Sequence, residues 1–165
     1  YERLDKDIQM MIDAGINVIR VGESTWSLYE PQEGKFEFEW LDKVIDKFHK
    51  AGIKVILGTP TYSIPAWMAL RHPDLFVEKL DGGKAGFGIR QNFDITNPTY
   101  LFYSERIIRK MMEHYAKHPA IIGFQVDNET TTYGAANFNF FRGFVNYMKD
   151  KYKTTENLNK LWGLS

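Results

Sequence analysis

Near the start of the chain, the spacing of the hydrophobic residues changes from helical to strand-like within about 20 residues. Apolar residues lie at helical spacing over residues 3–14, where Leu4, Ile8 and Met11 share one face, and the pattern stops at Gly15, the residue type that most often ends a helix. A β-branched run follows at 16–21. This first unit therefore predicts a helix that leads directly into a buried strand.

A second unit repeats this order. Apolar residues lie on one helical face between 40 and 48, Ala51-Gly52 ends the pattern, and the run 53–57 reads as a strand. The six-residue motif AGI(N/K)VI occurs at 14–19 and again at 51–56. Alternating helices and buried strands are typical of parallel βα units, so the repetition predicts a parallel sheet.

The third unit is longer and is followed by one more helix. A helix is expected at 98–117, with proline at its first position, and it leads into an apolar strand at 121–126. A fourth helix is expected at 136–152, with an inward face made by Phe140, Phe141, Phe144, Val145 and Met148. No glycine-rich phosphate loop opens any of these helices. The fold class is therefore α/β, and a partial (β/α)₈ TIM barrel fits better than an open nucleotide-binding sheet.

The connections between the elements differ in length. The links from helix to strand have one or two residues, whereas the links after the strands are long, at 22–39, 58–97 and 127–135. Barrel enzymes carry their chemistry on the loops that follow the strands. The asymmetry therefore favours an enzyme.

Three polar residues, Asp127, Asn128 and Glu129, directly follow the third strand. A carboxylate and an amide at the carboxyl end of a barrel strand are candidate catalytic groups. Strands also often end in an ordinary Asp or Asn turn, which is the alternative. Side-chain alternation along the strand would place Asp127 and Glu129 on the side of Gln125, with Asn128 pointing the other way unless the end of the strand twists or bulges.

Composition and charge exclude several classes of partner. The 165 residues are 44% hydrophobic, and 21 Lys and Arg balance 21 Asp and Glu without a basic stripe, so nucleic acid is not an expected partner. No apolar run approaches the ~18 residues of a membrane span, so no membrane partner is expected. The first residues lack the order of a signal peptide, which favours a cytoplasmic over a secreted location, although a leader upstream is compatible with this.

Arg20 lies inside the first predicted strand, where a buried charge without a partner would be very costly. It must therefore meet a carboxylate, and the alternatives are a catalytic group and a structural ion pair. Glu23 and Trp26 follow the same strand and are candidates for the wall of a site.

Four strings carry a specific resemblance. They are RVGESTWSLYEPQEGKFEFEWLD, GIKVILGTPTYSIPAWMALRHPDL, FGIRQNFDITNP and HPAIIGFQVDNE. In this order and spacing the chain resembles the family 42 glycoside hydrolases, which are retaining β-galactosidases built on (β/α)₈ barrels. The resemblance implies that residues 1–165 are a fragment of one catalytic barrel domain, covering about barrel strands two to four.

The resemblance also implies roles for single residues. Glu129 would be the general acid/base, Asn128 would bind the sugar 2-hydroxyl, and Arg90 would hold the galactosyl group. The alternative for Arg90 is an exposed arginine of the loop without a role in binding. The nucleophile of this family follows the seventh strand and lies outside these residues. Arg20 would support that nucleophile, and the isolated chain is expected to be inactive.

The chain departs from the family pattern at a metal site. Many members carry a cysteine-based zinc site, but this chain has no cysteine, so neither a metal nor another cofactor is expected. The implied partner is a β-galactoside or oligosaccharide, and the implied assembly is a homotrimer. A related retaining β-glycosidase and a non-catalytic carbohydrate-binding remnant remain alternatives.

Overall fold

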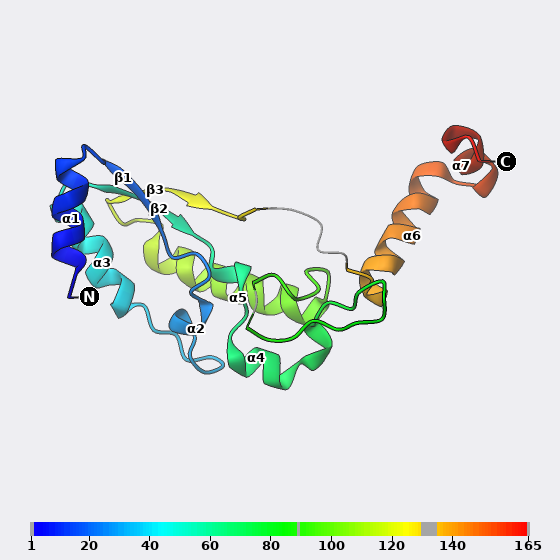
Figure 1. The fold of residues 1–165 in the computed structure, drawn as a ribbon, viewed down its shortest axis with the longest axis horizontal. Coiled ribbons are helices and arrows are strands. Elements are labelled where there is room, and N and C mark those ends of the chain that lie inside the picture. Colours follow the sequence, from blue (N-terminus) through cyan, green and yellow to red (C-terminus); the bar gives the residue numbers. More distant parts are fainter. Residues whose placement is uncertain (1, 89, 130–134, 165) are drawn as a thin grey trace.

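The fold is built on a three-stranded parallel sheet (Figure 1). The computed structural model describes residues 2–88, 90–129 and 135–164. The strands lie in the order β1-β2-β3, as the repeated helix–strand pattern predicts. The bounds of the strands are β1 Val18–Val21, β2 Lys54–Gly58 and β3 Ile121–Gln125.

Three helices cover one face of this sheet. They are α1 Leu4–Asp13, α3 Glu39–Lys50 and α5 Pro98–Tyr115. Their apolar stripes meet the strands in one core that includes Ile45, Leu57 and Ile107, each fully buried. None of the helices in the described residues covers the opposite face, and Figure 1 shows α5 running below the sheet. Parallel sheets in α/β proteins are normally covered on both faces, so the uncovered face is where further parts of a barrel would lie.

Local signals fix the ends of α5. Pro98 occupies its first turn, and the side chain of Asn97 accepts a hydrogen bond from the Thr99 amide at 2.9 Å. Such a cap satisfies one of the amide groups that a helix start leaves unpaired. At the other end, His114 Nε2 lies 2.8 Å from Asp42 Oδ1 of α3, which links the two helices.

The long links after β1 and β2 contain short helices. These are α2 Trp26–Tyr29, η1 Pro60–Tyr62, α4 Ala66–Arg71 and η2 Pro73–Leu75. Their packing depends on a buried carboxylate, since Glu30 has no exposed surface and forms an ion pair with Arg106 of α5. Trp26 Nε1 donates to the same carboxylate at 3.0 Å. Trp26 is therefore a core residue, and its prediction as a wall of the site is wrong.

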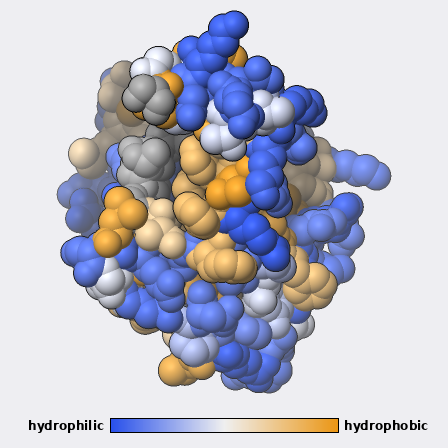
Figure 2. Space-filling model, turned by 90° about the vertical axis from the view of Figure 1, so that its right-hand side faces the viewer, coloured by the Kyte–Doolittle hydropathy of each residue, from blue (hydrophilic) through white to orange (hydrophobic). Residues whose placement is uncertain are grey.

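The last two helices do not contribute buried residues to the core. They are α6 Phe138–Tyr152 and α7 Thr155–Trp162, and neither has a buried residue. The prediction of an inward face on α6 is therefore wrong for the described chain: Phe140, Phe141 and Phe144 are 45%, 61% and 50% exposed. Figure 1 shows α6 leading away from the sheet, and Figure 2 views the molecule from this end, where hydrophobic side chains lie among hydrophilic ones at the surface. Among the described residues, α6 contacts α7, and its Val145 and Met148 are partly buried, but α6 does not join the core around the sheet.

The strand bounds are shorter than the apolar runs suggested. β1 begins at Val18 rather than at residue 16, and β3 ends at Gln125, so that Val126 is 79% exposed. No helix among the described residues is long and apolar enough to span a membrane.

Candidate active site

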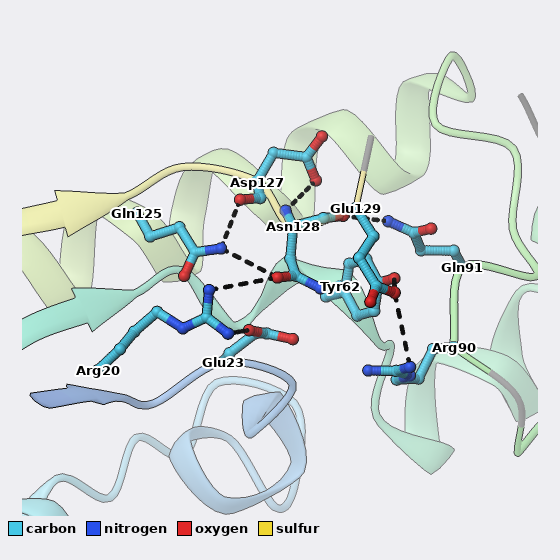
Figure 3. Close-up of polar contacts among 9 residues, drawn as sticks. All are labelled: Arg20, Glu23, Tyr62, Arg90, Gln91, Gln125, Asp127, Asn128 and Glu129. Carbon is cyan, nitrogen blue, oxygen red and sulfur yellow. Dashed lines mark hydrogen bonds and ion pairs between the residues drawn. The ribbon is translucent and has the colours of Figure 1, made fainter. Parts of the chain in front are cut away.

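The carboxyl end of β3 turns back on itself. The Gln125 side-chain amide donates to the Asp127 carbonyl at 2.7 Å and to Asn128 Oδ1 at 3.2 Å, and Asp127 Oδ1 accepts from the Asn128 amide at 2.8 Å (Figure 3). Asn128 therefore lies with Gln125, which is the exception to alternation that the sequence left open for the end of the strand. The physical reason is that the strand has already ended at Gln125, so side chains no longer alternate.

Arg20 reaches this turn from β1. Its guanidinium lies 3.3 Å from the Glu23 carboxylate and donates to Asn128 Oδ1 at 3.4 Å. The expectation of a buried Arg20 is wrong for the described chain, because its side chain is 51% exposed on the uncovered face of the sheet. The structure shows the ion-pair alternative, with Glu23 as the carboxylate. Glu23 thus lies beside Arg20 and Asn128 at the candidate site.

Glu129 stands beside two side chains from the loop after β2. Tyr62 Oη donates to Glu129 Oε2 at 3.1 Å, and the Arg90 guanidinium lies 3.8 Å from the same oxygen. Arg90 also lies over the Tyr62 ring, 5.0 Å from its centroid, which is a cation–π geometry. The Glu129 side chain is 67% exposed. A carboxyl group with this exposure can reach a ligand that enters above the strand ends.

The backbone of Glu129 is in an uncommon conformation, with φ at 47°. Residues other than glycine rarely adopt positive φ, and such outliers cluster at functional sites. The neighbouring backbone is held in place, since the buried Gln91 donates its side-chain amide to the Asn128 carbonyl at 3.2 Å. Thr59 bonds the strand end as well, from its amide to the Gln125 carbonyl at 2.9 Å and from its hydroxyl to the Val126 carbonyl at 3.1 Å.

Three further residues of the candidate site lie in the loop after β2 and were not predicted from the sequence to have a role. They are Thr59, Tyr62 and Gln91. Each acts through a contact across 37 or 67 residues of sequence. No local spacing rule predicts such a contact. One signal was available for Tyr62, which lies in the loop directly after a strand, where barrel enzymes place their site residues.

No group of three or more His, Asp or Glu side chains in the described part of the chain could hold a metal ion. What the arrangement offers is a carboxyl, a phenol hydroxyl, a guanidinium and an amide at one end of a parallel sheet. These groups donate and accept hydrogen bonds, and the carboxyl can exchange a proton with a bound ligand.

Solved structures show which fold this sheet belongs to. The β-galactosidase of Rahnella sp. R3 superposes with a TM-score of 0.91 at 34% identity over 98% of this chain and 24% of its own. The enzyme of Marinomonas ef1 gives 0.89 at 38% identity over 98% of this chain and 25% of its own. The class is therefore an α/β protein with part of a (β/α)₈ barrel, which confirms the expected fold class.

The sequence comparisons define the family within this class. The family model described as β-galactosidase, glycoside hydrolase family 42, matches residues 1–165, and the chain belongs to this family. It is 38% identical to the β-galactosidase BbgII of Bifidobacterium bifidum over 96% of this chain and 23% of the relative. It is 40% identical to BgaA of a Planococcus species over 96% of this chain and 23% of the relative. The chain thus spans about a quarter of the length of these relatives.

Proposed function

We propose that this chain supplies the general acid/base carboxyl of a retaining β-galactosidase that removes terminal non-reducing β-D-galactosyl residues. The observation that carries the proposal is the position of Glu129, whose carboxyl group lies beyond the carboxyl end of β3 in contact with Tyr62 and Arg90. The names of the relatives supply the substrate class.

Retaining cleavage divides the work between two carboxyl groups. Glu129 gives its proton to the glycosidic oxygen as that bond breaks, while a second carboxylate, ~5–5.5 Å away, attacks the anomeric carbon. Glu129 then takes a proton from the water that releases the sugar. The second carboxylate comes from outside the 165 residues, and so the isolated chain is expected to give no turnover of a nitrophenyl galactoside.

The neighbours of Glu129 have complementary tasks. Arg90 can donate several fixed hydrogen bonds to adjacent hydroxyls of the galactosyl ring. Asn128 binds the 2-hydroxyl, where hydrogen bonds strengthen as the transition state forms. Arg20 holds Asn128 from the far side at 3.4 Å and faces the region in which the nucleophile would stand.

The test replaces Glu129 by Gln in the polypeptide that carries the complete barrel. Loss of the proton donor should lower kcat/KM on galactosides with poor leaving groups by about 10²-fold or more. Formation of the covalent intermediate from a dinitrophenyl galactoside should be largely kept, because that leaving group needs no proton. Glu113→Gln is the matched control, since this exposed carboxylate on α5 pairs with Lys110 at the surface.

Full activity of Glu129→Gln on poor leaving groups would overturn the assignment. Equal loss on both substrates would also contradict it, because a misfolded site does not discriminate between leaving groups. A homotrimer is a separate proposal from family resemblance, and the mass of the intact protein in solution tests it.

A further inference from the structure

Tyr62 reaches the candidate site from a buried position. It ends η1, and only 7% of its surface is exposed. Its hydroxyl nevertheless donates to Glu129 Oε2 at 3.1 Å (Figure 3). A side chain this deeply buried offers a ligand little surface, so we expect any role of Tyr62 in the reaction to act through Glu129.

The surrounding chain holds Tyr62 in place. The Gln91 amide donates to the Tyr62 carbonyl at 3.2 Å, which joins two distant parts of the loop after β2. The Arg90 guanidinium lies over the Tyr62 ring, 5.0 Å from its centroid. The preceding residue is held as well, because the Tyr100 hydroxyl of α5 donates to the Thr61 carbonyl at 3.0 Å. The Tyr62 hydroxyl is therefore a donor in a fixed position.

Two donors approach the same oxygen of Glu129. Besides the Tyr62 hydroxyl, the Arg90 guanidinium lies 3.8 Å from Oε2. In a protonated carboxyl group one oxygen carries the hydrogen, and the other is the better acceptor of a hydrogen bond. Donors at Oε2 therefore favour the form of Glu129 that carries its hydrogen on Oε1. The backbone φ of 47° at Glu129 is uncommon, and the bond from Tyr62 helps to hold the side chain of that residue in one orientation.

On the basis of the proposed function, we infer that Tyr62 is a positioning residue, which holds Oε2 of Glu129 so that Oε1 delivers the proton to the leaving group. In the first step the hydrogen on Oε1 moves to the glycosidic oxygen, which keeps the electron pair of the breaking C–O bond. In the second step Oε1 takes a proton from the attacking water. Tyr62 keeps its own proton throughout, and its hydrogen bond is strongest to the carboxylate that exists between the two steps.

The experiment uses the polypeptide with the complete barrel and the variant Tyr62→Phe. This change removes the hydroxyl and keeps the ring under Arg90. The value of kcat/KM on an alkyl galactoside should fall about three- to tenfold, as expected for the loss of one hydrogen bond. On a dinitrophenyl galactoside it should fall less than about twofold, because that leaving group needs no proton. Both substrates are measured on one preparation, so the ratio of the two losses does not depend on the fraction of folded protein.

Tyr100→Phe is the matched control. It removes another buried phenol hydroxyl bonded to the same loop, but this hydroxyl bonds the Thr61 carbonyl instead of Glu129. It should change kcat/KM on the two substrates by the same factor.

A double variant tests whether the Tyr62 hydroxyl acts through Glu129. On a nitrophenyl galactoside, Tyr62→Phe combined with Glu129→Gln should match Glu129→Gln alone within about twofold, because no proton donor is left to position. Additive losses in the double variant, no loss in Tyr62→Phe, or an equal loss on both leaving groups would overturn the inference. These results leave the proposed function intact as long as Glu129→Gln alone discriminates between the leaving groups. If Glu129→Gln does not discriminate, the proposed function is contradicted and the inference fails with it.

Discussion

Two helices of this chain have similar apolar stripes and opposite surroundings. Helix α5 buries Tyr100, Ile107 and Met111 against the sheet. Helix α6 presents Phe140 and Phe144 at comparable spacing and buries neither. Periodicity alone therefore identifies a helix and its apolar face, but it does not show that a partner for that face is present in the same stretch of chain.

The two helices differ because α5 packs against the sheet, whereas α6 lies away from it. Helix α5 lies against β2 and β3 and forms part of the core, and Arg106 on it neutralises the buried Glu30. Helix α6 follows the candidate site and leads away from the sheet (Figure 1). Since the chain spans about a quarter of its relatives, we expect the apolar face of α6 to be covered by a part of the barrel outside residues 1–165.

The largest expected effect is on the buried ion pair of α5. Arg106→Met should destabilise the purified protein by about 3–5 kcal/mol, because it leaves the carboxylate of Glu30 buried without its charge partner. Arg109→Met is the control, since Arg109 pairs with Glu105 at the surface and should change little. Urea unfolding measures both variants, and similar values for the two would contradict the importance of burial.

The next prediction compares the two apolar stripes directly. Ile107→Ala on α5 should cost about 2–5 kcal/mol, because Ile107 is fully buried and its removal leaves a cavity. Phe144→Ala on α6 should change the free energy of unfolding of the 165-residue chain by less than about 0.5 kcal/mol, because Phe144 is half exposed. A large loss for Phe144→Ala in this chain would mean that α6 has a partner after all.

Alkaline pH should lower the free energy of unfolding, because the core contains buried tyrosines. Burial raises the pKa of Tyr100 above its usual value and raises that of Tyr29 still further. Above about pH 10, each phenol ionises in the unfolded chain while it is still neutral in the folded state. The contribution of each phenol to the free energy of unfolding is therefore fully present below about pH 10 and is lost as the pH rises above it. At pH 11 the loss should be about 1.4 kcal/mol for Tyr29, and Tyr100 should add a loss in the same direction. Unfolding at several pH values measures it, and Tyr29→Phe should reduce the slope.

The smallest effect concerns the helix caps. Asn97→Ala should cost about 1 kcal/mol, because its side chain caps α5 and also donates to Asp74 at 3.1 Å. Thr154→Ala removes the analogous cap of α7, where Thr154 Oγ1 accepts from the Asn157 amide at 3.2 Å, and should cost less because α7 buries nothing. Equal costs would show that α7 contributes as much to the fold as α5 does.

Most of the fold could be predicted from the sequence. The three strands, their parallel order and helix α5 follow from local signals, such as Gly15 and Gly52 at helix ends and Pro98 at a helix start. The site was predicted less completely. Glu129, Asn128 and Arg90 were named, but Tyr62 and Gln91 were given no role, because their contacts join segments of chain that only folding brings together.

Local signals along the chain are sufficient to define which segments are helices and strands, because propensity and hydrophobic period act over a few neighbouring residues. It also located the polar break at the end of β3. Long-range contacts are needed to show that Asn128 turns back toward Gln125, that Arg20 pairs with Glu23, and that Phe140 and Phe144 of α6 are exposed. These features depend on the residue at which a strand ends and on contacts between residues that are far apart in the sequence. Short-range sequence patterns predict neither.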